Sequence, residues 1–237
     1  MVNMKKIFVV SDIHGHYDIL KKALADAGFD KQNPAHLLVC CGDYFDRGTE
    51  NTEVLQFFER LPNAVLLRGN HEDMLLKLLQ TGQLLPHHYI NGTLQTVENF
   101  FGKYAIDPAT DKVDFTGKTR VVDRLTEFIE ETVDYFETEH YIFVHGWLPD
   151  GNWREATPEQ WVQARTKRWS EHYKGDVPVP GKTLICGHMP AVYAKLFDPS
   201  RGIGNYTPYY GNGLIAIDGA TADSQQVNVI VLEDELC

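Results

Sequence analysis

Acidic, amide and imidazole side chains recur just after short apolar runs in this 237-residue chain. The runs span residues 7–10, 37–41, 64–67, 141–144 and 183–186. Each is followed within four residues by one or two polar groups, which are Asp12 and His14, Asp43, Asn70, His145 and His188. These side chains offer oxygen and imidazole nitrogen but no thiolate, a donor set that suits Mn, Fe, Zn or Mg-like ions rather than a structural zinc.

Strands that end at such residues would gather them at one edge of a sheet. An open α/β sheet builds its site outside the carboxyl ends of its strands. Asp12 and His14 lie two residues apart, on the same side of an extended segment, and a carboxylate such as Asp43 can bridge two ions. Each residue alone also fits a structural role, as a turn residue or a core histidine, but five coincidences in order favour a two-metal phosphoesterase.

The elements that position these groups can be read from apolar periodicity. Residues 17–27, 51–61 and 72–79 have helical spacing, so strand and helix alternate through the first eighty residues and predict an α/β fold. A further helix is expected at residues 121–136. Another should begin at Thr157-Pro158-Glu159-Gln160 and run to about residue 169, with strands at residues 214–218 and 227–233. We find no linker or repeat and predict a single domain over residues 1–237.

Composition restricts the class of protein. The formal net charge of −11 argues against non-specific nucleic-acid binding, and a phosphate site must therefore be locally positive. No apolar run reaches the roughly 20 residues of a membrane helix, and the apolar stretch at the start is too short for a signal peptide. The four cysteines are interpreted as buried free thiols of a reducing compartment. We expect a cytoplasmic protein without a membrane partner.

Three blocks of sequence resemble the signature of a known family. They are Asp12-Ile13-His14-Gly15, Gly42-Asp43-x-x-Asp46-Arg47-Gly48 and Gly69-Asn70-His71-Glu72. In order and spacing, and with the later single histidines, they resemble the PPP-type phosphoprotein phosphatases of the calcineurin-like metallophosphoesterase superfamily. The likeness covers about residues 5–220 and is closest to small bacterial and phage Ser/Thr phosphatases. It implies a mixed β-sandwich flanked by helices.

The resemblance also implies a role for each matching residue. Asp12, His14 and Asp43 would hold one divalent ion, and Asp43, Asn70, His145 and His188 would hold the second. Mn²⁺ is the expected ion, with Fe, Zn, Ni or Mg as alternatives. A hydroxide between the two ions would attack phosphorus in line. His71 would be the general acid rather than a ligand, with Asp46 orienting its imidazole.

Arginines are expected to bind the phosphoryl oxygens, because their planar donors suit bidentate contact. The resemblance assigns this role to Arg47 and expects a second arginine between His145 and His188. Arg165 aligns best, and Arg168 is a competitor. The chain departs from the family pattern at Trp147 and Met189, which places the substrate in doubt rather than the chemistry.

We therefore predict a dinuclear-metal-dependent phosphomonoesterase, with a phosphorylated protein or a small phosphoester as substrate. Serine or threonine phosphate on a protein is the natural candidate. One alternative is a symmetrical dinucleoside tetraphosphate hydrolase with the same metal centre, and another is a non-enzymatic binding module on the same fold. Residues 80–120 match no family block and are expected to cover or frame the site. Residues 202–213 form a Gly- and Tyr-rich loop that is either a substrate-facing lip or a surface connection. The oligomeric state stays open.

Overall fold

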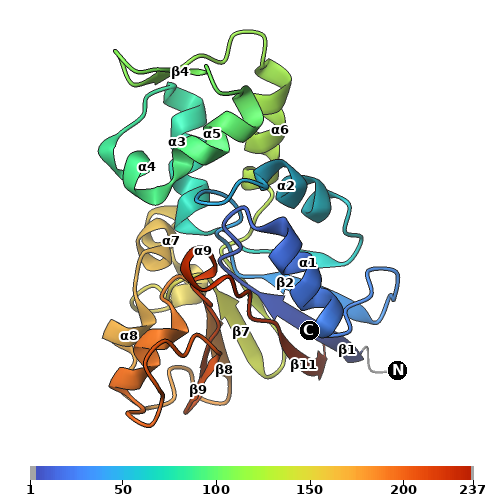
Figure 1. Ribbon diagram of the computed structural model, residues 1–237. Helices are drawn as coiled ribbons and strands as arrows, with labels where there is room; N and C mark the ends of the chain where they lie inside the picture. Colours follow the sequence, from blue (N-terminus) through green and yellow to red (C-terminus); the bar gives the residue numbers. More distant parts are fainter. Residues whose placement is uncertain (1–3, 236–237) are drawn as a thin grey trace.

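The computed structural model describes residues 4–235 and contains two β-sheets packed face to face (Figure 1). The first has the strand order β11-β1-β2-β3, formed by β11 (Ile230–Glu235), β1 (Met4–Val10), β2 (His36–Cys40) and β3 (Ala64–Leu66). The second has the order β6-β7-β8-β10-β9, formed by β6 (Tyr135–Glu137), β7 (Tyr141–Val144), β8 (Thr183–Cys186), β10 (Leu214–Ala216) and β9 (Tyr209–Gly211).

The inner strands of both sheets run parallel. β1, β2 and β3 pair in parallel, as do β7, β8 and β10, whereas β11, β6 and β9 are antiparallel to their neighbours. Parallel strands are covered on both faces, which explains their nearly continuous apolar runs. In β1, Ile7 and Val9 face the core between the sheets, and Phe8 and Val10 face the helices.

Helices cover the outer face of each sheet. Against the first sheet lie α1 (Tyr17–Asp26), α2 (Asn51–Glu59), α3 (Asn70–Thr81) and α6 (Thr119–Glu130). Against the second lie the 3-10 turns η1 (Trp153–Glu155) and η2 (Ala191–Leu196), with α7 (Pro158–Arg165) and α8 (Trp169–His172). The short helix α9 (Thr221–Ser224) follows β10. The predicted helix-flanked mixed sandwich is confirmed.

The segment that matched no family block forms helices of its own. It contains α4 (Pro86–Asn91), α5 (Thr93–Phe101) and a hairpin of β4 (Ile106–Asp107) and β5 (Lys112–Val113). We call residues 86–113 the cap segment. Figure 1 shows it at one end of the molecule, beside α3 and α6. The buried Val97 and Phe100 of α5 join the same core as Val54 and Phe58 of α2.

Several predicted boundaries were wrong. The helix expected at residues 121–136 ends at Glu130, because the segment after it pairs as extended chain. Val133 exchanges backbone hydrogen bonds with the end of β3, and residues 135–137 form β6. The helix expected to reach residue 169 is divided into α7 and α8, although its capping box at Thr157 and Gln160 forms as predicted. Part of the Gly- and Tyr-rich loop forms β9.

Cys40, Cys41 and Cys186 are buried free thiols, and Cys237 lies outside the described residues. Within residues 4–235, no helix is both long and apolar enough to span a membrane.

Candidate metal centre

The loops that follow β1 and β2 are joined by backbone hydrogen bonds. The amide of Asp12 donates to the carbonyl of Gly42 at 3.0 Å, and the amide of His14 donates to the carbonyl of Asp43 at 3.1 Å. The amide of Gly15 likewise donates to the carbonyl of Tyr44, at 2.8 Å. The first two family blocks are therefore held in register beyond the strands, which brings their side chains to one edge of the sheet.

Asp43 lies at the centre of the buried cluster. His145 Nε2 is 3.4 Å from its Oδ1, and the Nε2 atoms of His14 and His71 are 3.7 and 3.8 Å from its Oδ2. Two groups have ligand atoms within 4.8 Å of one another: His14, Asp43 and His71 form one, and Asp43, His145 and His188 form the other. Asp43 belongs to both groups, as expected of a bridging carboxylate.

Three of the histidines are oriented by main-chain carbonyls. His14 Nδ1 bonds Phe45 O at 2.8 Å, His145 Nδ1 bonds Cys41 O at 2.7 Å, and His188 Nε2 bonds Thr166 O at 3.2 Å. A carbonyl only accepts, so the bonded nitrogen carries a proton, and in a neutral ring the opposite nitrogen keeps its lone pair. This support is typical of metal-binding histidines.

Asp12 and Asn70 also contact this cluster. The Asp12 carboxylate accepts from Ser11 Oγ at 2.5 Å and from the His188 amide at 3.0 Å, which connects β1 to the loop after β8. Asn70 Oδ1 lies 2.9 Å from His145 Nε2, within the second group. Together with the two groups above, all six predicted metal ligands lie in one region. Their oxygen and imidazole donors fit hard or borderline divalent ions, while the individual ligand assignments stay predictions.

His71 is supported differently from the other histidines. Its Nδ1 is 2.7 Å from Asp46 Oδ2, a carboxylate rather than a carbonyl, and both side chains are about 3% exposed or less. Its ring stands edge-on to His14, with centroids 4.7 Å apart. The pairing with Asp46, which sequence spacing could not establish, is present. The general-acid role stays a prediction, since His71 also belongs to the first ligand group.

Burial and neighbouring charges shift the pKa values of these groups in opposite directions. Burial lowers the pKa of His14 well below its ordinary value and that of His188 to about 4, so both imidazoles are neutral near pH 7. Burial alone would raise the pKa of Asp43, but the surrounding histidines, His145 foremost, hold it below its usual range. Asp43 is thus ionised beside the neutral imidazoles of His14 and His188, a state that favours cation binding.

His71 keeps its proton for the opposite reason. Burial would lower its pKa, but the charge of Asp43 and the hydrogen bond to Asp46 outweigh burial and raise it to about 9. Cations bound beside Asp43 would counter part of this rise.

Several of the predicted site residues have a strained backbone conformation. In residues 4–235, nine non-glycine residues have a positive φ. Six of them are predicted site residues: Asp12, His14, Asp43, Asp46, Arg47 and His188. This conformation is unfavourable for residues with a Cβ and tends to occur at functional sites.

Two glycines allow the loops to approach this closely. A Cβ on Gly69 would lie 2.1 Å from Asp43 Oδ1, and a Cβ on Gly187 would lie 2.3 Å from Asp12 Oδ2. Neither position can hold a larger residue without displacing a predicted ligand.

The predicted phosphate-binding arginines separate into two kinds. Arg47 is exposed beside the cluster, and its amide donates to the carbonyl of Gly92 at 3.2 Å. Arg165 is buried; it bonds both oxygens of Asp73, at 2.7 and 3.1 Å, and Asp134 at 2.5 Å. These carboxylates occupy its guanidinium, so the geometry does not support Arg165 as a phosphate ligand.

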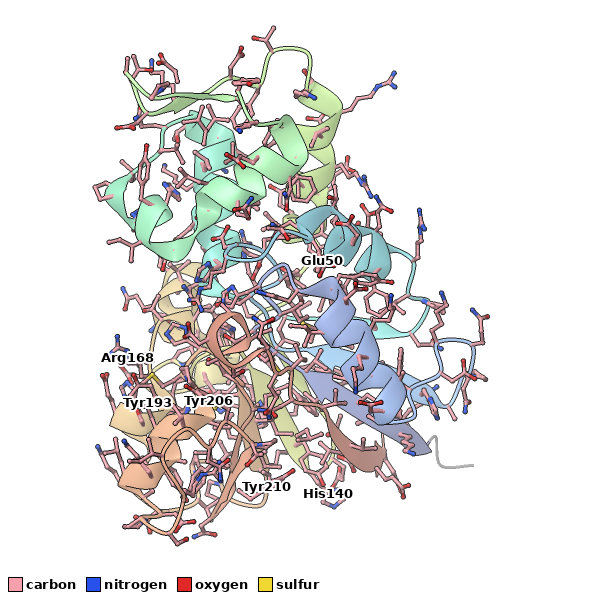
Figure 2. The ribbon with its side chains drawn as sticks, in the orientation of Figure 1. Glu50, His140, Arg168, Tyr193, Tyr206 and Tyr210 are labelled. Atoms are coloured by element: carbon pink, nitrogen blue, oxygen red, sulfur yellow. The ribbon has the colours of Figure 1, made fainter. Side chains whose placement is uncertain are left out.

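The competitor, Arg168, has a side chain 57% exposed and a single ion pair of 3.4 Å with Glu171. It lies two residues after Thr166, whose carbonyl orients His188. Figure 2 shows Arg168, the N-cap of α8, on the same side of the molecule as Tyr193 and Tyr206, whereas Tyr210 and His140 lie at the lower end.

Sequence reasoning missed three residues that hold the site together. Glu72 is fully buried and accepts from the amides of Asp43, Tyr44 and Gly69 at 2.9–3.0 Å, which joins the second and third blocks. Burial raises its pKa to about 7. Thr93 and Thr96 of α5 donate to Asp46. Glu72 was visible within the third block, but nothing in residues 80–120 signalled the threonines.

Comparison with known proteins agrees with this geometry. The profile of the family described as calcineurin-like phosphoesterase matches residues 5–216. Serine/threonine-protein phosphatase 2 of Salmonella typhimurium is 29% identical over 204 residues, 81% of this chain and 84% of that protein. A symmetrical bis(5'-nucleosyl)-tetraphosphatase of Hamiltonella defensa is 35% identical over 72 residues, which is 30% of this chain and 26% of that protein.

Solved structures share the fold. A putative diadenosine tetraphosphatase has a TM-score of 0.60 at 17% identity, covering 98% of this chain and 94% of that one. A Saccharomyces cerevisiae serine/threonine phosphatase similar to human PP5 has a TM-score of 0.56 at 15% identity, covering 98% and 80%.

Proposed function

The chain belongs to the calcineurin-like phosphoesterase family, and we propose that it is a two-metal phosphomonoesterase acting on serine or threonine phosphate in proteins. The observation that carries the proposal is the single buried carboxylate, Asp43, shared by two groups of ligand atoms, with the His71–Asp46 pair directly beside it.

The ligand assignment follows the family blocks, because the ligand group that contains His14 and Asp43 also contains His71 but not Asp12. Asp12, His14 and Asp43 would hold one ion, and Asp43, Asn70, His145 and His188 the other, with Mn²⁺ as the proposed metal. When bound, two such ions supply Lewis acidity, an activated water and positive charge for the phosphoryl oxygens. That charge matters in a chain of net charge −11.

His71 would donate a proton to the departing alkoxide. The bond to Asp46 uses Nδ1, so in the protonated imidazole the second proton is on Nε2, on the side of Asp43. Asp46 both fixes the ring and stabilises its positive charge, as carboxylates do in other His–Asp pairs. Departure of a serine or threonine alkoxide needs this proton more than departure of an acidic phenol does.

Arg47 and Arg168 would bind the phosphoryl oxygens. Both are exposed, and each is attached to a loop that carries a predicted ligand or the carbonyl that orients one. Their planar guanidinium groups can each bond two phosphoryl oxygens. We replace Arg165 by Arg168 in this role, because Arg165 is already paired on both sides.

The substrate class is supported by the extent of the similarity. The match to the Salmonella phosphatase covers 81% of this chain, whereas the match to the Hamiltonella tetraphosphatase covers 30%. The tetraphosphatase activity stays the second candidate, since a structure of that title shares the fold.

The deciding experiment measures phosphate release from a phosphoserine peptide and ADP formation from diadenosine tetraphosphate, both with the Mn²⁺-loaded protein and with chelator controls. Preferential turnover of the peptide, lost with chelator, is the expected result. Preferential cleavage of the dinucleotide to two ADP molecules would replace the proposal by the tetraphosphatase, and binding without turnover of either substrate would favour a non-enzymatic module.

A further inference from the structure

The cap segment contributes side chains to the catalytic edge of the sheet. Its helix α5 begins at Thr93, and Thr96 follows three residues later, on the same helix face. Both threonines are completely buried. They face Asp46, which lies more than forty residues earlier in the sequence and is also completely buried. The cap segment therefore contacts Asp46, the partner of His71.

Three donors converge on the Asp46 carboxylate. Thr93 Oγ1 donates to Oδ2 at 2.9 Å, and Thr96 Oγ1 donates to Oδ1 at 2.7 Å. Oδ2 also accepts from His71 Nδ1 at 2.7 Å. Both carboxylate oxygens are thus fixed, so the carboxylate cannot rotate away from the imidazole without breaking two hydroxyl hydrogen bonds.

The backbone of Asp46 is held by the same helix. Its amide donates to Thr96 Oγ1 at 2.9 Å and to Asn51 Oδ1 at 3.1 Å. Asn51 in turn bonds Asn99 of α5 at 2.7 Å. Asp46 has a φ of 74°, which is unfavourable for a residue with a side chain. Such a conformation persists only where surrounding contacts fix it, and here α5 supplies several of those contacts.

We propose that Thr93 and Thr96 are positioning residues for proton donation: their hydroxyls hold the Asp46 carboxylate so that it orients the His71 imidazole and stabilises its charge. The proposal rests on the proposed function, because it assigns His71 the part of proton donor. It gives the cap segment a role in the reaction itself, in addition to framing the site.

The primary variant is Thr93→Val, which keeps the shape of the side chain and removes the hydroxyl. Thr93 is preferred to Thr96 because it makes a single bond to Asp46, whereas Thr96 also accepts from the Asp46 amide. Thr93→Ser restores the donor. Thr132→Val is the matched control, since Thr132 is a buried threonine that bonds Ile129 O at 2.5 Å, at the end of α6.

The kinetic readout compares a phosphoserine peptide with p-nitrophenyl phosphate. Loss of a residue that orients a metal-ligating side chain commonly costs 10–100-fold in activity, and we take the same range for residues that orient a proton donor. We expect Thr93→Val to lower kcat for the peptide by about that factor, and much less for the activated ester, whose leaving group needs no proton. Thr93→Ser should recover most of the loss, and Thr132→Val should change neither substrate. An equal loss on both substrates would overturn the proposal.

A second readout does not depend on turnover. In ¹⁵N-histidine-labelled protein loaded with diamagnetic Mg²⁺ or Zn²⁺, the His71 Nδ1 proton bonded to Asp46 should give a downfield resonance, assigned by its loss in His71→Asn. Thr93→Val should move or broaden it, and Thr93→Ser should restore it. An unchanged resonance in Thr93→Val would overturn the positioning role even if activity fell.

Failure of the two proposals can be told apart. A wild-type protein that hydrolyses neither phosphomonoester refutes the proposed function. If the wild-type enzyme is active and the Thr93 variants have the same kcat values as the Thr132→Val control, only the positioning role is refuted. Thermal melting checks that each variant is folded, and Thr93→Ala replaces Thr93→Val if the added methyl group against the carboxylate lowers the melting temperature strongly.

Discussion

Arg165 and Arg168 lie three residues apart, and the structure predicts different effects for the same substitution at the two positions. The Arg165 side chain is 4% exposed and forms a two-bond pair with Asp73, plus a bond to Asp134. The Arg168 side chain is 57% exposed, and its partner Glu171 is 61% exposed. We expect Arg165→Gln to affect stability and Arg168→Gln to affect catalysis.

The magnitude for Arg165 follows from burial. Removing one partner of a buried ion pair costs about 3–5 kcal/mol. Asp134 is 38% exposed, so its bond contributes little, and Asp73 keeps Arg68 as a neighbour at 2.8 Å. We therefore expect a loss of about 2–4 kcal/mol in the free energy of unfolding. For a chain of this length, that corresponds to a fall of roughly 5–15 °C in Tm.

The expected effect at Arg168 is kinetic. An exposed ion pair of 3.4 Å contributes at most about 1 kcal/mol, so Arg168→Gln should leave the unfolding free energy nearly unchanged. Losing a charge-assisted bond to phosphate, about 1.5–3 kcal/mol, should lower kcat/KM by roughly 10–100-fold.

Urea denaturation and steady-state kinetics on a phosphoserine peptide separate the two effects. Arg165→Gln with wild-type stability and a strongly reduced kcat/KM would refute the reasoning and restore Arg165 as the phosphate ligand. Arg168→Gln with wild-type kinetics would remove Arg168 from the site.

Three further predictions concern single residues. Asp43→Asn should reduce binding of both ions, measured as metal content per chain, because one carboxylate serves both ligand groups; unchanged stoichiometry and turnover would contradict the bridge. His71→Asn should retain the metals and lower kcat by about 10²–10⁴ for an alkyl phosphate and less for an aryl phosphate; equal losses would argue against a general acid. Burial alone would raise the pKa of Asp234, but bonds from Thr138 and His140 hold it at about 2, so this stabilisation is present above pH 4 and is lost as the pH falls towards 2. Asp234→Asn should thus cost about 1–2 kcal/mol at pH 7, less than the full shift implies because His140 is exposed, and urea titrations should show the difference from wild type closing below pH 3.

The fold was predictable where local pattern and tertiary structure agree. Apolar runs gave the parallel strands of both sheets, because parallel strands are buried on both faces. The helix at 119–130 was predicted too long because acidic residues continue past Glu130, at Glu131 and Asp134, whereas pairing of Val133 with β3 takes the chain out of the helix. That pairing joins residues 66 positions apart, and no local propensity records it.

The site was predictable as a set of residues but not as a set of contacts. The three blocks give the order of the ligands, and the later histidines complete it. The choice between Arg165 and Arg168 depends on which arginine meets Asp73 and Asp134, which belong to other elements. The threonines on Asp46 were beyond reach for the same reason, since a threonine in a helix carries no signal of what its hydroxyl contacts.

The two kinds of histidine support explain how one cluster could separate binding from proton transfer. Burial leaves the rings of His14 and His188 neutral, with a lone pair for a cation, whereas the charge of Asp43 and the carboxylate partner Asp46 favour the charged ring at His71. The separation therefore does not depend on residue type, because all three residues are histidine. It depends on whether a carboxylate hydrogen bond offsets burial, and α5 of the cap segment helps to hold Asp46 in place.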